Sequence, residues 1–199
     1  MAFHRIWLDR DQQQYSDQEL VNQALENKAA YALIVRRYEA PLLRYIVRVM
    51  REDFGAAQKL LMEVFIKTYI YLNEYDNSIS FSSWIYRIAH DEIAEYLPHQ
   101  KGESGALKQD YDASAFEAIV DTFGLKDQAG QANGTAFDEV RAAVDHLESR
   151  SRDVVLLKFF EKKTYEEIAD ILRLPLKLID TLLNDAAEKL KNYLKQSQR

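Results

Sequence analysis

Apolar residues recur every three or four positions along most of this chain, in two blocks separated by a segment of different composition. That spacing places side chains on one face of an α-helix, whereas a half-buried strand needs strict alternation. The sequence holds neither an alternating run long enough to compete nor an internal repeat. At 199 residues it is long enough for two small hydrophobic cores. We therefore expect an all-α fold.

The first block covers residues 1–97 and predicts a compact helical bundle. Ser16 and Glu19 have the spacing of a capping box, which marks a helix start, and an apolar period follows them. Pro41 lacks an amide hydrogen and is expected to kink or restart that helix. Two more helical segments follow the interruption "REDFG": "AAQKLLMEVFIKTYIYL" and, after the turn-like "NEYDNSIS", "FSSWIYRIAHDEIAEYL".

The segment 98–134 reads as a flexible linker, because it holds five of the six glycines of the chain among many polar residues. A short helix is expected within it, around "SAFEAIVDTF". The second block, residues 135–199, is again helical throughout, with breaks at "ESRS", "EKK" and "RLP". Two helical domains joined by a tether are therefore predicted.

The stretch "TYEEIADILRLPLKLIDTLL" has the form of a helix-turn-helix. Thr164 and Glu167 form a second capping box, and the chain turns at Arg173-Leu174-Pro175. The period of the helix that follows buries Ile179, Leu182, Leu183, Ala186 and Leu190. The same period places six residues on the outer face: Lys177, Asp180, Thr181, Asn184, Asp185 and Glu188. A plain helical hairpin would show the same periodicity, so both interpretations stay open at this point.

Composition excludes several function classes. The chain has no cysteine, hence no disulfide, thiolate nucleophile or cysteine zinc site, and its four histidines lack metal-ligand spacing. There is no phosphate-binding glycine loop and no nucleophile elbow, so we expect neither an enzyme nor a cofactor. Without a signal peptide or a bilayer-spanning apolar run, a cytoplasmic protein that makes no membrane contact is predicted. The net charge of -6 argues against nonspecific coating of nucleic acid.

The two blocks resemble a known family. The segments "DQELVNQALENKAAYALIVRRYEAPLLRYI" and "LESRSRDVVLLKFFEKKTYEEIADILRLP" look like the two conserved domains of bacterial extracytoplasmic-function sigma factors, of the sigma-70 superfamily. "MEVFIKTYIYL" and "FSSWIYRIAH" resemble the helices between them. The resemblance implies a region 2-like bundle that binds RNA polymerase core and melts the promoter, and a region 4-like helix-turn-helix that reads promoter DNA.

It also implies site residues. Polymerase binding would fall to Leu60, Leu61, Glu63, Val64, Phe65 and Lys67. DNA binding would fall to Trp84, Arg87, His90, Thr164, Tyr165, Lys177, Thr181 and Asn184. Aromatic residues at helical spacing also fit core packing, so for Trp84 the choice between core and promoter contact stays open.

The chain departs from the family pattern where charge matters. Four usually basic positions of the DNA-reading helix hold Asp180, Leu182, Asp185 and Ala187, and two of these repel phosphate. After "WIYRIAH" the helix continues with acidic residues in "DEIAEYLPHQ", and the family's acidic lead before the polymerase-binding core is replaced by "AAQK". The DNA-contact surfaces are therefore expected to be weakened.

Two hypotheses follow. The first is a divergent sigma factor that binds RNA polymerase core and promoter DNA, with its affinity coming mainly from the polymerase. The second is a sigma-fold regulator that binds a protein, such as an anti-sigma partner, and no longer binds promoter DNA. Basic charge at the four positions named above is the feature that separates them.

Overall fold

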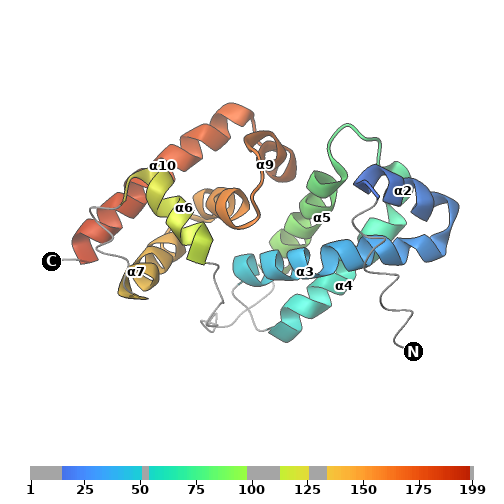
Figure 1. The fold of residues 1–199 in the computed structure, drawn as a ribbon, viewed down its shortest axis with the longest axis horizontal. Coiled ribbons are helices and arrows are strands. Elements are labelled where there is room, and N and C mark those ends of the chain that lie inside the picture. The colour runs from blue at the N-terminus through green and yellow to red at the C-terminus, as the bar shows by residue number, and fades with distance from the viewer. Residues whose placement is uncertain (1–14, 51–53, 98–112, 126–133, 198–199) are drawn as a thin grey trace. The chain divides into compact units, whose positions relative to one another are not determined.

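The computed structural model describes residues 15–50, 54–97, 113–125 and 134–197 (Figure 1). Every regular element within these ranges is a helix or a helical turn, so the all-α prediction is confirmed for them. Backbone contacts divide the chain into two compact units, Met1–Leu107 and Lys108–Arg199. Each unit buries its own apolar residues.

In the first unit α3 packs against α4 and α5, and α4 also packs against α5. Buried apolar side chains come from all three of these helices, so they share one core. The described elements are α2 (Asp17–Glu26), η1 (Lys28–Ala30), α3 (Tyr31–Met50), α4 (Phe54–Ile70), η2 (Leu72–Glu74) and α5 (Phe81–Tyr96). The fully buried residues include Leu20, Ile34, Leu42, Tyr45, Ile46, Ile85 and Ile93.

Local signals set the beginning of this unit. Ser16 caps α2 by accepting a hydrogen bond from the Glu19 amide at 3.3 Å, and its own amide donates to the Glu19 carboxylate at 2.6 Å. The predicted capping box is therefore present. Pro41 lies inside α3, which runs from Tyr31 to Met50 as one helix, so the helix does not restart there.

The second unit is a helical bundle in which α10 packs against α7, α8 and α9. Its described elements are α6 (Ala113–Phe123), α7 (Gly134–Asp145), α8 (Ser149–Val155), η4 (Leu156–Phe160), α9 (Tyr165–Leu172) and α10 (Leu176–Ser197). Of these, η4 is a single turn of π-helix that continues α8. The core includes Val154, Leu157, Ile168, Ile171, Ile179, Leu183 and Leu190.

The helix predicted around "SAFEAIVDTF" is α6, and it packs against η4 and α7. Part of the segment predicted as a linker, 98–134, thus belongs to the second unit. The remainder of that segment lies outside the described residues, apart from Gly124, Leu125 and Gly134. The domain bounds 1–97, 98–134 and 135–199 stay a prediction.

Candidate functional site

The helix-turn-helix is formed by α9 and α10. The capping box of α9 is closed in both directions: the Glu167 amide donates to Thr164 Oγ1 at 3.1 Å, and the Thr164 amide donates to Glu167 Oε2 at 2.9 Å. Arg173 ends α9 in the left-handed conformation with a φ of 51°, and the amide of Leu174 donates to the Ala169 carbonyl at 3.1 Å. This turn directs the chain into α10, so the local signals of the sequence build the motif.

The inner face of α10 is buried where the apolar period placed it, at Ile179, Leu183, Ala186 and Leu190, while Leu182 is half-buried. All six residues predicted to point outward are exposed: Lys177, Asp180, Thr181, Asn184, Asp185 and Glu188. The prediction of the two faces is therefore confirmed, with Leu182 at the boundary. This outer face is the surface that a helix-turn-helix would present to the major groove.

Polar side chains on this outer face bond within the helix. Thr181 donates its hydroxyl to the Lys177 carbonyl at 3.1 Å, and the Asn184 amide lies 3.5 Å from the Asp180 carboxylate. Among the four positions at which the family usually has a basic residue, Asp180 and Asp185 are exposed carboxylates. Both would face phosphate on a docked DNA.

The other two predicted DNA contacts of this unit lie at the beginning of α9. Thr164 is exposed, but its hydroxyl is used in the helix cap. Tyr165 is half-buried, and Lys158 Nζ lies 4.7 Å from the centre of its ring. This separation fits a cation–π contact, so Lys158 places a positive charge beside the helix-turn-helix that sequence reasoning did not identify.

The predicted DNA-binding residues of the first unit, Trp84, Arg87 and His90, are all half-buried on α5. The Trp84 ring packs against Tyr75 and Phe81, with centroid separations of 5.3 and 5.6 Å. His90 Nδ1 lies 3.0 Å from the hydroxyl of Tyr45, a residue with no exposed surface. Trp84 is thus both part of an aromatic cluster and partly open to solvent.

The predicted polymerase-binding residues lie on α4, and they differ in exposure. Leu60, Leu61 and Val64 are buried in the core of the first unit. Phe65 is half-buried, and its carbonyl accepts a hydrogen bond from Tyr31 at 2.7 Å. Glu63 is exposed.

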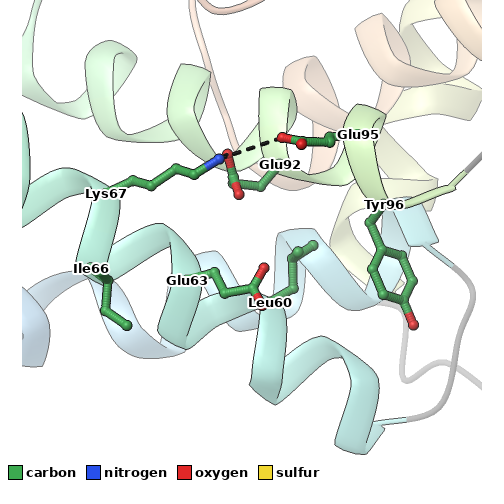
Figure 2. A pocket seen from close by; sticks show the side chains of 7 residues that line it. All are labelled: Leu60, Glu63, Ile66, Lys67, Glu92, Glu95 and Tyr96. Atoms are coloured by element: carbon green, nitrogen blue, oxygen red, sulfur yellow. Dashed lines mark hydrogen bonds and ion pairs between the residues drawn. The ribbon is translucent and has the colours of Figure 1, made fainter. Parts of the chain in front are cut away.

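A groove of about 450 Å³ runs between α4 and α5, and it brings three of the predicted residues together (Figure 2). Its lining consists of Leu60, Glu63, Ile66, Lys67, Glu92, Glu95 and Tyr96. Three of these seven residues are carboxylates and one is a lysine, so the groove combines an apolar floor with an acidic surface.

Lys67 is held by the two carboxylates of α5 (Figure 2). Its ammonium group donates a close hydrogen bond to Glu92, whose side chain is 7% exposed, and lies 3.4 Å from Glu95 Oε2. The hydrogen bond to Glu92 raises the pKa of Lys67 above its ordinary value, although desolvation acts in the opposite direction. Lys67 therefore links α4 to α5 within the first unit.

Sequence reasoning missed the apolar residues that α4 does expose. Met62, Ile66 and Ile70 are 65%, 55% and 59% exposed, and their spacing of four residues aligns them along the helix. The signal was available, because α4 is apolar on nearly every side while a single core covers only one of them. An exposed apolar stripe of this kind marks a protein-contact surface.

Other kinds of site find little support in the described part of the chain. Among those residues, no group of three histidine, cysteine or carboxylate side chains is placed to hold a metal ion. Likewise, none of the helices described is both long and apolar enough to cross a membrane.

Comparisons with known proteins match both units to parts of one family. The family model for sigma-70 region 2 matches residues 34–102, and that for sigma-70 region 4 matches residues 137–190. The RNA polymerase sigma-H factor of Pseudomonas aeruginosa is 29% identical over 91% of this chain and 95% of its own length. The ECF RNA polymerase sigma-E factor of Escherichia coli is 27% identical over 90% of this chain and 95% of its own length.

Solved structures show the same fold. A solved structure of CnrH in complex with the cytosolic domain of CnrY matches this chain with a TM-score of 0.63 and 18% identity. The match covers 90% of this chain and 97% of the matched chain in that structure. The sigma factor RpoE of Bartonella quintana, in complex with the anti-sigma factor NepR, covers 83% of this chain and 96% of that chain, with a TM-score of 0.57 and 14% identity.

Proposed function

This chain belongs to the sigma-70 family, as a divergent extracytoplasmic-function member, and we propose that it starts transcription with weakened DNA-contact surfaces and relies on RNA polymerase for promoter affinity. The family function is that of a sigma factor in transcription initiation. The proposal rests on the order of the two family matches. Sigma-70 region 2 matches the unit with the α4–α5 groove, and sigma-70 region 4 matches the unit with the helix-turn-helix that follows it. Such a factor directs the polymerase and needs no catalytic residue or cofactor of its own, and its place of action is the cytoplasm.

Polymerase core is the partner proposed for the exposed apolar stripe of α4, formed by Met62, Ile66 and Ile70. Side chains four residues apart on one helix present a continuous apolar surface, which gains free energy when a partner covers it. Glu63 lies beside the stripe at the groove and adds a polar edge. In this arrangement the buried Leu60, Leu61 and Val64 support the contact surface from within.

Promoter DNA is the second partner, and we assign it a weak direct contact. The outer face of α10 offers Lys177, Thr181 and Asn184 to the DNA, but Asp180 and Asp185 oppose the phosphate charge. Tethering to polymerase raises the effective concentration of such contacts at the promoter, so a low intrinsic affinity is sufficient. Trp84, Arg87 and His90 are the proposed contacts from the first unit.

An anti-sigma protein is a third candidate partner, and the acidic outer face of α10 favours a second function in which this partner replaces DNA. A sigma-fold regulator of this kind, for example a decoy, would keep its apolar surfaces for a partner helix and lose promoter binding. The solved structures with CnrY and NepR are complexes of sigma-fold chains with other proteins. The two functions differ in whether the chain still binds promoter DNA, and a chain that does not bind polymerase core would also fit the second function.

The experiment is a pull-down of polymerase core with the purified chain, followed by fluorescence anisotropy of the mixture with promoter-length DNA across a salt series. For a working sigma factor we expect core binding, DNA binding that requires core, and loss of DNA binding as salt rises. Core binding without promoter binding would favour the decoy. A chain that does not bind core would contradict both the α4 assignment and the promoter function.

A further inference from the structure

Helix α4 buries one side in the first unit and leaves the opposite side open. Its buried residues are Ala57, Leu60, Leu61, Val64 and Thr68. Since each residue turns an α-helix by about 100°, Met62 lies on the opposite side, where it is 65% exposed. Six residues lie within about 60° of Met62 around the helix, and none of them is buried: Gly55, Gln58, Lys59, Phe65, Ile66 and Tyr69. These seven residues are called the Met62 face below.

The sizes of the side chains on the Met62 face suit a second copy of the same face. In an antiparallel pair of helices with a two-fold axis at Met62, a residue before Met62 faces the residue equally far behind it in the other copy. Tyr69 then faces Gly55, which has no side chain and leaves room for the ring. Tyr69 is 39% exposed and meets Tyr31 edge to face, with ring centroids 5.1 Å apart, so the ring is already supported within its own chain.

The charges of α4 fit the same arrangement. The helix carries three charged residues, and Lys67 is turned towards α5, where it binds two carboxylates (Figure 2). The other two, Lys59 and Glu63, are exposed and line one groove with Tyr96 of α5. Neither forms an ion pair with another residue in the described part of the chain.

The two-fold axis places the Lys59–Glu63 edge of one helix beside the same edge of the other. Lys59 then lies only about 3 Å along the helix axis from Glu63 of the partner subunit, at about 1.5 Å per residue. The contact occurs twice, because the pair is symmetric. Opposite charges at the edge of an apolar helix contact favour one orientation of the two helices, here the antiparallel one.

We propose that the Met62 face is a homodimer interface, in which two copies of the chain pair their α4 helices antiparallel around Met62. Burial of Met62 and Ile66, which are 65% and 55% exposed, supplies the free energy of association. The two Lys59–Glu63 pairs set the direction and register. The same two apolar residues belong to the stripe assigned to polymerase core, so the dimer covers that surface. This last consequence rests on the proposed function, and it makes the dimer a form of the chain that does not bind core.

The first test reverses the charges and follows the full chain by sedimentation velocity across a concentration series. Lys59→Glu and Glu63→Lys each turn two attractive pairs into repulsive ones, so each variant should dimerise at least about tenfold more weakly than the original chain. An equimolar mixture of the two variants should recover the dimer, because every facing pair then carries opposite charges. Lys28→Glu, at an exposed position of η1, is the matched control and should dimerise like the original chain.

The second test uses the absence of cysteine from the chain. Met62→Cys places a thiol at the axis in both copies, whereas Ile70→Cys places the two thiols about 24 Å apart along the axis. Ile70 is 59% exposed, so an oxidant reaches both positions. Mild oxidation should therefore link the Met62→Cys chain into a dimer and leave the Ile70→Cys chain unlinked.

A chain that stays monomeric across the series, or a mixture of the charge variants that does not recover the dimer, would overturn the proposal. Equal linking of Met62→Cys and Ile70→Cys would exclude the antiparallel register and would overturn it as well.

Capture on immobilised polymerase core separates the dimer from the proposed function. The disulfide-linked Met62→Cys dimer should not be captured, and reduction of the disulfide should increase its capture. A linked dimer that core still captures would contradict the competition between dimer and core. Failure of the original chain to bind core would contradict the proposed function, while the dimer interface is decided by the two tests made without core.

Discussion

Lys67 in the last turn of α4 donates a hydrogen bond to Glu92 of α5. The Glu92 side chain is only 7% exposed, so without Lys67 its carboxylate would be buried with no positive partner. A carboxylate removed from water is costly unless it is paired. The pair therefore fixes α4 against α5 beside the groove and sets how α4 presents its exposed apolar stripe.

Replacing Lys67 by Met should lower the free energy of unfolding by about 1–3 kcal/mol, because Glu92 is left buried without its donor. This loss is smaller than that for breaking a fully buried ion pair, because the Lys67 side chain is 40% exposed and solvent screens the pair. Urea denaturation followed by circular dichroism measures the change. Adding Glu92→Leu to Lys67→Met should recover most of the loss, while Glu95→Ala, at a carboxylate that is 70% exposed, should change stability little. Equal effects of Lys67→Met and Glu95→Ala would contradict this role of Glu92.

The contribution of the Lys67–Glu92 pair to the free energy of unfolding should also fall at alkaline pH. The pKa of Lys67 is raised in the folded chain, so its stabilising contribution is complete below the unfolded pKa and is lost as pH rises through the folded value. The difference in unfolding free energy between the chain and Lys67→Met should stay constant from neutral pH to about pH 10 and shrink above it. Urea titrations across that range test this, and a difference that shrinks on the acidic side of neutrality would point to another group.

The acidic outer face of α10 should limit DNA binding. Asp180→Arg combined with Asp185→Arg replaces two exposed carboxylates with phosphate-binding groups, so promoter affinity of the core complex should rise and the salt slope should steepen by roughly one to two units. Anisotropy across a salt series measures both. A control with Glu39→Arg and Glu117→Arg makes the same change in net charge elsewhere. An equal gain in the control would show a general charge effect.

Ile66→Glu should weaken binding to polymerase core by at least about tenfold, because it places a charge in the centre of the exposed stripe of α4. Stability should hardly change, since the side chain is already 55% exposed. Ala40→Glu, on an exposed position of α3, is the matched control. Unchanged core binding by Ile66→Glu would place the polymerase contact on another surface.

Lys162→Gly should raise the free energy of unfolding by about 0.5–1 kcal/mol. Lys162 has a φ of 54°, a left-handed conformation that costs an ordinary side chain energy and glycine none. Asn77 has a φ of 61° but tolerates this region, so Asn77→Gly should gain less. Chemical denaturation of the two variants compares them, and a larger gain at Asn77 would contradict the explanation.

Several features of this protein are already fixed by residues close together in the chain. The capping boxes at Ser16 and Thr164 close over three residues, so they form wherever a helix starts there. The outer face of α10 follows from one clear apolar stripe, which leaves Asp180 and Asp185 exposed without reference to any other helix.

Tertiary structure alone decided what α4 and α6 do. Because α4 is apolar on nearly every side, its sequence indicates that part of its apolar surface lies outside the core, and the packing of α3 and α5 then selects the inner side, where Val64 is buried while Ile66 stays exposed. The pairing of Lys67 with Glu92 and the docking of Phe116 on Phe160 join residues far apart in the sequence. Periodicity describes the face of one helix, whereas the choice of which faces meet depends on the packing of the whole unit.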